Sequence, residues 1–114
     1  MDDPPRVTVN VAKVYRVLLE DPAASHYGLE IGKAAELTGG SLYPLLLRLE
    51  QAGILASDWE DVDPSEAGRP RRRLYWLTSK GAEHARRALE EMQRSITPSQ
   101  GGIPGFPAPG GVSA

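Results

Sequence analysis

The chain has 114 residues, of which 40% are hydrophobic, and this suits one small domain with a single core but not a catalytic domain beside a regulatory one. It contains no cysteine, which excludes a disulfide framework, a thiolate zinc site and a cysteine nucleophile. The net charge is only −2, so any basic surface must come from local clustering of charge and not from an overall positive potential.

Two helices are predicted in the first third of the chain, after an N-terminal segment, residues 1–6, that we expect to be flexible. The first helix lies between Asn10, a possible N-cap, and the Asp21-Pro22 stop. Four apolar residues recur in it at helical spacing: Val11, Val14, Tyr15 and Leu18. Ser25 is the expected N-cap of a shorter second helix that reaches about Leu37. This second helix contains two glycines and must gain its stability from tertiary packing.

The segment from 39 to 55, GGSLYPLLLRLEQAGIL, predicts a third helix. Gly39-Gly40 is a typical turn and Ser41 is the expected N-cap, so the second and third helices form a tight helix-turn-helix pair. Pro44 then falls in the first helical turn, where a missing N–H costs nothing. Gly53 follows the last helical residue, where glycine adopts a left-handed cap without strain.

The third helix is predicted to have one apolar face and one open face. Four leucines follow the i, i+3, i+4, i+7 pattern of a buried stripe: Leu42, Leu45, Leu46 and Leu49. Tyr43, Leu47 and Arg48 are left facing outward. We therefore interpret this segment as a recognition helix.

Strand-prone residues beyond the third helix predict an antiparallel hairpin. The two strands run from Ile54 to about Asp61 and from Arg72 to Leu77, with the turn-rich DPSEAGRP between them. Here an acidic block is followed at once by a basic one: Asp58, Glu60, Asp61, Asp63 and Glu66, then Arg69, Arg71, Arg72 and Arg73. The sorting of charge predicts a local basic tip within an acidic total.

A last helix is predicted from Ser79 to about Ile96. Its apolar positions alternate in steps of three and four, which is typical of a coiled-coil-like seam: Ala82, Ala85, Leu89, Met92 and Ile96. Residues 97–114 are rich in proline and glycine, and we expect a disordered tail there.

These elements predict a mainly α fold with a small β-hairpin (α+β). It is a winged helix-turn-helix over residues 7–78 with an added C-terminal dimerisation helix over 79–96. Five motifs, in this order and spacing, resemble the PadR-like transcriptional regulators across roughly residues 7–95: HYGLEI at 26–31, SLYPLLLRLEQAGIL at 41–55, Trp59-Glu60, GRPRRR at 68–73 and YWLTSKG at 75–81. The resemblance implies a DNA-binding regulator of the smaller branch of that family, in which one terminal helix builds a homodimer.

The resemblance places Ser41, Tyr43 and Arg48 on double-stranded DNA, because the N-terminal end of a recognition helix lies nearest the duplex. Lys33, on the outer side of the second helix, is a further phosphate candidate. The alternative is that the Tyr43 ring caps the core and that Arg48 pairs with a nearby glutamate.

The hairpin tip carries a stiff Arg-Pro segment that suits the narrow minor groove of A·T-rich DNA. The residues expected to bind DNA from this wing are Arg69, Arg71, Arg72 and Arg73. Arg69 and Arg71 are expected to project from the tip, whereas those nearer the strand can pair with carboxylates. The alternative is a solvated charge ladder that touches no ligand.

Apolar side chains around the first helix and on the last helix exceed what so small a domain would bury, which predicts a two-fold dimer. This surplus consists of Val7, Val9, Val17 and Leu19 and of Ala82, Ala85, Leu89 and Met92. The expected interface residues are Val11, Val14, Leu18, Ala82, Ala85, Leu89 and Met92. Trp76 is expected to be underpacked in a monomer. With Tyr15 it could line a small-molecule effector pocket at the dimer interface; plain hairpin packing is the alternative.

Catalysis has little support in the sequence. His26 and His84 lie far apart, and the acidic run DWEDVDPSEAG lacks the ligand spacing of a calcium loop. We expect no enzyme, no metal and no cofactor. The resemblance instead implies a repressor that binds a palindromic operator and is released by a signal. The rival interpretation is a winged-helix protein-interaction module or adaptor without DNA binding, which the acidic net charge would suit.

A cytoplasmic location is expected. The start MDDPPR is acidic and proline-rich, unlike the basic region of a signal peptide. No apolar run approaches the ~18 residues of a membrane span, so we expect no membrane partner.

Overall fold

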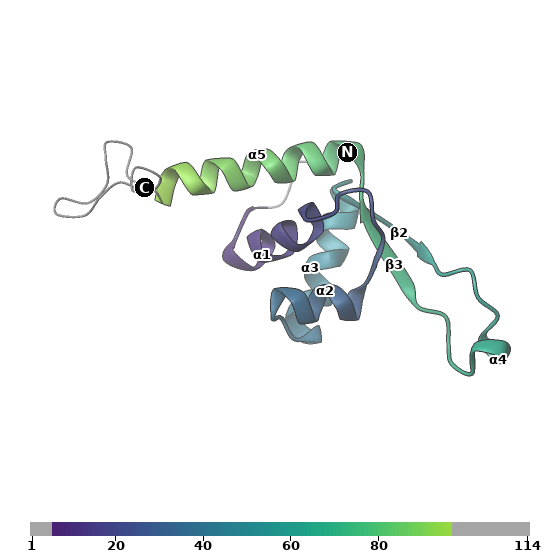
Figure 1. Cartoon of the computed structure of the whole chain (residues 1–114). Coiled ribbons are helices and arrows are strands. Elements are labelled where there is room, and N and C mark those ends of the chain that lie inside the picture. Colours follow the sequence, from purple (N-terminus) through teal and green to yellow (C-terminus); the bar gives the residue numbers. More distant parts are fainter. Residues whose placement is uncertain (1–5, 97–114) are drawn as a thin grey trace, which may run out of the picture.

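The computed structural model describes residues 6–96, which form a helical domain with an extended hairpin and a long final helix (Figure 1). The disordered tail predicted for 97–114 lies outside the described residues, as does all of the predicted flexible N-terminus except Arg6. In Figure 1 the hairpin reaches away from the helices, and the final helix runs along the other side of the domain. The predicted winged helix with an added C-terminal helix is therefore confirmed. Along the described residues, no helix has both the length and the apolar character needed to cross a bilayer.

Helix α1 spans Val9–Leu19 and begins one residue before the predicted cap. Its N-cap is Thr8, which has an extended backbone and whose side-chain oxygen accepts the Val11 N–H at 3.2 Å, so the predicted N-cap at Asn10 is wrong. Asn10 lies inside the first turn instead. The apolar stripe is buried as predicted.

Strand β1, His26–Tyr27, precedes helix α2, Gly28–Ala35, and was not expected from the sequence. The predicted N-cap at Ser25 is wrong, because the chain pairs with the sheet for two residues before it turns into the helix. Tyr27 is the N-cap residue, and the Glu30 carboxylate accepts its N–H at 2.8 Å. Pairing of His26 with Tyr75 enlarges the predicted two-stranded hairpin to three strands.

Helix α3 spans Gly39–Gln51, and it begins three residues earlier than the predicted N-cap at Ser41 implies. Thr38 is the N-cap residue and its carbonyl accepts the Ser41 and Leu42 N–H groups at 3.1 and 2.8 Å, so Ser41 is not the cap. Gly39-Gly40 forms the first helical residues and not a turn. Pro44 therefore lies in the second turn, where it has no N–H to donate to the carbonyl of Gly40.

The sheet has the order β1-β3-β2, with β2 spanning Leu55–Trp59 and β3 spanning Arg73–Leu77. β2 and β3 are antiparallel, with Ser57 opposite Tyr75. Between them, at the tip of the hairpin, lies the short helix α4, Pro64–Ala67. Gly53, in the turn between α3 and β2, has φ 80°, which confirms the predicted left-handed position.

Helix α5 spans Ser79–Ile96 as predicted, and it starts in direct contact with the backbone of the turn before β2. A Cβ on Gly81 would lie 1.9 Å from the carbonyl oxygen of Ile54, so only glycine fits there. The Thr78 hydroxyl donates to the Gly53 carbonyl at 2.7 Å and accepts the Gly81 N–H at 2.9 Å. Together these contacts hold the end of β3 and the start of α5 as one rigid junction.

Candidate nucleic-acid interface

Helix α3 buries one face and leaves the other free, as predicted. The leucine stripe is buried in the core: Leu42, Leu45, Leu46 and Leu49. Tyr43 is 47% exposed and Leu47 is 55% exposed, and Ser41 and Arg48 are exposed as well. Within residues 6–96, no hydrogen bond or ion pair holds the Arg48 guanidinium, so the alternative in which Arg48 pairs with a glutamate is not found. Lys33 on α2 is also exposed.

The Tyr43 ring is fixed against the first residue of α2. A Cβ added to Gly28 would lie 2.8 Å from Cε1 and 2.9 Å from the hydroxyl oxygen of Tyr43. Glycine at position 28 therefore makes room for the ring. The tyrosine both packs on the neighbouring helix and keeps about half of its surface open. Its hydroxyl lies beside the N-terminus of α2, where the helix dipole favours negative charge.

A small hollow beside α3 is lined by a second arginine, Arg6, that no sequence motif had indicated. The hollow has a volume of about 140 Å³, and Arg6 and Arg48 line it with no carboxylate among the lining residues. The other lining residues are Thr8, Val11, Leu45 and Leu49. Arg6 belongs to the segment that the sequence predicts to be flexible. Its positive charge next to the first helix was the only sequence signal for a role in DNA binding.

The wing is organised by one buried carboxylate, Glu60, which is 5% exposed. Glu60 accepts a short hydrogen bond from Arg69, and also accepts the Tyr27 hydroxyl and the Arg72 N–H, each at 2.9 Å. Arg69 is therefore folded inward, and the expectation that it projects from the tip is wrong. The cause is that Glu60 lies beneath the hairpin tip and Arg69 supplies its counter-charge.

The remaining wing arginines also have partners, either within the hairpin or in β1, but they stay more open. Arg71 is exposed and its Nε donates to the Val62 carbonyl at 2.9 Å. Arg72 is exposed and its guanidinium lies 4.9 Å from the centre of the Tyr27 ring. Arg73 is partly buried, and it donates to the Ser57 hydroxyl at 3.0 Å. Pairing with the hairpin and with β1 thus leaves two guanidinium groups, those of Arg71 and Arg72, at the surface, and DNA contact by the wing stays a prediction.

The pKa of Glu60 is lowered to about 2, chiefly by the hydrogen bond from Arg69, with further contributions from the Tyr27 hydroxyl and the Arg72 N–H. The same bond raises the pKa of Arg69. The pKa of Tyr27 is raised as well, chiefly because its hydroxyl donates to Glu60. Glu60 is therefore ionised throughout the physiological range and keeps the wing base charged and ordered.

The family of the chain follows from a match that covers most of the winged helix and the first half of α5. The model of the transcriptional regulator PadR-like family matches residues 18–87, which is more than half of the chain. The chain belongs to the PadR-like family of transcriptional regulators. It is accordingly a DNA-binding regulator and not an enzyme, as its motifs predicted. No curated protein matches the sequence significantly.

Solved structures share the fold of this PadR-like chain. It is similar to the PadR family transcriptional regulator from Eggerthella lenta DSM 2243, with 26% identity and a TM-score of 0.62 over 77% of this chain and 78% of that chain. NadR in complex with 4-hydroxyphenylacetate is 24% identical, with a TM-score of 0.58 over 79% of this chain and 60% of that one. Reduced AbfR bound to DNA is 24% identical, with a TM-score of 0.63 over 82% of this chain and 59% of that one.

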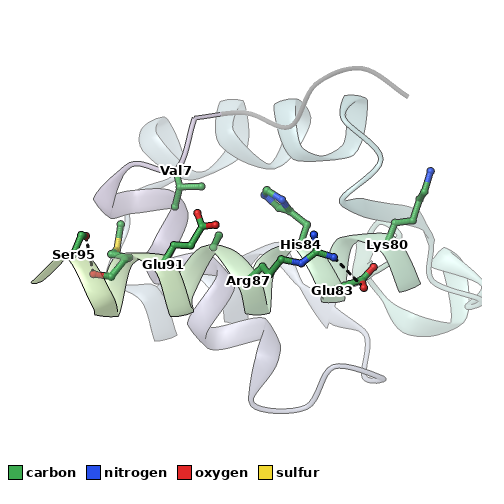
Figure 2. Close-up of a pocket in the computed structure, with 9 residues that line it drawn as sticks. Val7, Lys80, Glu83, His84, Arg87, Glu91 and Ser95 are labelled. Atoms are coloured by element: carbon green, nitrogen blue, oxygen red, sulfur yellow. Dashed lines mark hydrogen bonds and ion pairs between the residues drawn. The ribbon is translucent and has the colours of Figure 1, made fainter. Parts of the chain in front are cut away.

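A larger hollow of about 690 Å³ runs along α5 of the PadR-like chain (Figure 2). Val7 lies on one side of it, and charged and polar residues of α5 line the other: Lys80, Glu83, His84, Arg87, Glu91 and Ser95. Arg87 and Glu83 form an ion pair at 3.0 Å along the helix. Among the described residues, no three potential metal ligands are grouped.

The predicted pocket residue Tyr15 does not line an open cavity. It is fully buried, its ring meets that of His84 edge-on at 5.6 Å, and burial raises the pKa of its hydroxyl to about 12. Trp76 is partly buried on β3, opposite Ala56. Tyr15 thus belongs to the α1–α5 contact and not to a ligand surface.

Most of the predicted interface residues are buried within the chain itself. Their exposed fractions are 9% or less because α1 packs on α5 and on the rest of the core: Val11, Val14, Leu18, Ala82 and Ala85. The expectation that these side chains lie at the surface of a dimer interface is corrected by this packing. Leu89 and Met92, farther along α5, are only partly buried, and Val9 on α1 is 67% exposed.

Proposed function

We propose that this PadR-like regulator inserts α3 into the major groove of double-stranded DNA and lays the wing on the neighbouring backbone or minor groove. The observation that carries this docking is the open face of α3, where Tyr43 and Arg48 are exposed on the side opposite the core. The AbfR structure, which shares the fold, is one bound to DNA.

Within this docking, α3 and its surroundings supply the phosphate contacts. Ser41 and the Tyr43 hydroxyl donate near the start of the helix, and Arg48 acts with Arg6 from the hollow beside it. Lys33 on α2 reaches the same strand.

On the wing, we assign direct DNA contact to Arg71 and Arg72, because they are exposed. Arg69 and Arg73 serve mainly to hold the wing in shape, since Glu60 and Ser57 occupy them. The acidic residues of the tip disfavour contact between that end and the phosphates, so contact falls on the segment just before β3 and not on α4.

The proposed assembly is a homodimer in which the outer part of α5 meets a second copy. Leu89, Met92 and Val9 remain available for this contact, whereas the inner half of α5 is committed to α1. A two-fold axis would set two recognition helices about one DNA turn, ~34 Å, apart on a palindromic operator. We further propose that the protein represses transcription in the cytoplasm and that a small molecule bound in the α5 hollow releases it, as the bound 4-hydroxyphenylacetate of NadR suggests by analogy.

The test is DNA binding measured across a salt series. Arg71→Ala and Arg72→Ala are each expected to flatten the log-log salt slope by ~0.9, because each removes one phosphate contact. Arg86→Ala is the matched control, since Arg86 is an exposed arginine on α5 away from the wing. Unchanged slopes in both wing variants would overturn the wing assignment. Failure of the wild-type chain to bind any DNA would favour the protein-interaction module.

A further inference from the structure

The outermost line of α3 is nearly devoid of hydrogen-bonding side chains. Positions 40, 44, 47 and 51 are spaced by four, three and four, and at about 100° per residue they lie opposite the leucine stripe. They are Gly40, Pro44, Leu47 and Gln51, and all four are exposed. Only Gln51, at the last position of the helix, can donate or accept through its side chain.

Leu47 is the large side chain at the centre of this line. It is 55% exposed, although the leucines on either side of it in the sequence, Leu46 and Leu49, are buried. By the same helical geometry, Tyr43 and Arg48 flank the line on its two sides. Both flanking residues suit phosphate or sugar, so the apolar line between them faces the floor of the groove and its base edges.

The floor of the major groove presents one apolar group, the C5-methyl of thymine. A leucine can bury that methyl but cannot satisfy the donors and acceptors of guanine, cytosine or adenine. Pro44 adds apolar surface one turn before Leu47 and brings no backbone donor. The chemistry of this line therefore selects thymine.

We propose that Leu47 is a specificity-determining residue that reads a thymine methyl in each half-site of the operator. This inference rests on the proposed docking of α3 in the major groove and names the base feature that the docked helix recognises. In this arrangement, the centre of the helix recognises the base through apolar contact. Arg48 and Tyr43 position the helix on the DNA backbone.

The experiment begins with DNA fragments selected from a random-sequence library by the full chain. Each thymine of the selected site is then replaced by uracil, which removes the C5-methyl and leaves the pairing unchanged. One thymine per half-site is expected to show about a fourfold loss of affinity on replacement, the scale of one buried methyl. In the Leu47→Ala variant the same replacement is expected to change affinity by less than about 1.5-fold.

Leu29→Ala is the matched control, because Leu29 is another exposed leucine, 63% exposed, but lies on α2. It is expected to keep the full penalty for uracil. Thermal unfolding checks that Leu47→Ala stays folded, which its exposed position favours. The proposal is overturned if no thymine of the site responds to loss of its methyl, or if the penalty survives in Leu47→Ala. If either result occurs while the wild-type chain still binds the selected DNA, only the role of Leu47 is refuted and the proposed docking of α3 stands. If the full chain selects no DNA at all, both the docking and the role of Leu47 are refuted.

Discussion

The two parts of the proposed DNA surface, α3 and the wing, differ in whether their side chains already have partners within the protein. On α3, Arg48 and Leu47 stand at the surface with no partner among the described residues. On the wing, every arginine from 69 to 73 has a partner within the hairpin or in β1. A free side chain acts only through its own contact, whereas a held one also fixes the shape of a segment that would otherwise lose entropy on binding. Substitutions should therefore act differently in the two regions.

The largest effect is expected from removing both contacts of α3. Tyr43→Ala combined with Arg48→Ala is expected to weaken DNA binding about a hundredfold, because two backbone contacts are lost. Arg48→Ala alone should also flatten the salt slope by ~0.9. Fluorescence anisotropy with one labelled operator at several salt concentrations measures both quantities. Loss of less than tenfold in the double variant would mean that the wing, and not α3, dominates affinity.

Gly28→Ala tests whether α3 depends on the orientation of Tyr43. The added methyl would meet the Tyr43 ring at 2.8 Å, so the ring must move while the backbone stays in place. We expect about a tenfold loss of DNA affinity, similar to that of a single lost contact, with little change in Tm. In a Tyr43→Ala background the same substitution should cost nothing more, which makes the cycle its own control.

The held wing predicts a smaller, indirect effect. Glu60→Gln removes the charge that gathers Arg69, Tyr27 and the Arg72 N–H, and we expect a few-fold loss of affinity through a slower association rate. The double variant Glu60→Gln with Arg69→Ala should be no worse than either single variant, since both break one ion pair. Stopped-flow association with labelled DNA distinguishes this result from two additive losses, which would assign Arg69 a DNA contact of its own.

The smallest effect concerns acid stability. The pKa of Glu60 in the folded chain is about 2, below its ordinary value of 4.5, so its ionised form stabilises the fold. That stabilisation is complete above pH 4.5 and is lost as the pH falls toward 2. Tm measured by circular dichroism between pH 7 and 2 should fall less steeply in Glu60→Gln than in the wild-type chain. Parallel curves would show that the carboxylate is equally ionised in the unfolded chain.

Periodicity and backbone special cases could be predicted from the sequence, but capping could not. The leucine stripe of α3 and the left-handed Gly53 depend on local spacing alone, and both were predicted. The caps at Asn10, Ser25 and Ser41 were wrong because a neighbouring residue or strand competes for the same N–H groups. Strand β1 exists only through its pairing with β3, which no local pattern indicates.

The candidate site shows the same division. The outward positions of Tyr43, Leu47 and Arg48 follow from helical geometry and were predicted. The inward fold of Arg69 depends on a carboxylate nine residues earlier that becomes buried only when the hairpin packs against β1. The room for the Tyr43 ring over Gly28 likewise requires that α2 and α3 are already in contact.

The junction at Gly81 couples two parts of the molecule mechanically. Since the backbone of α5 rests on the Ile54 carbonyl without space for a methyl group, the start of α5 cannot slide relative to the base of the hairpin. If α5 tilts, the hairpin must therefore rotate with it about the contact between Gly81 and Ile54. The displacement is largest at the tip of the hairpin, which lies farthest from that contact. If it tilts the helix, binding of a ligand or a second copy at the surface of α5 would thus change the orientation of the wing.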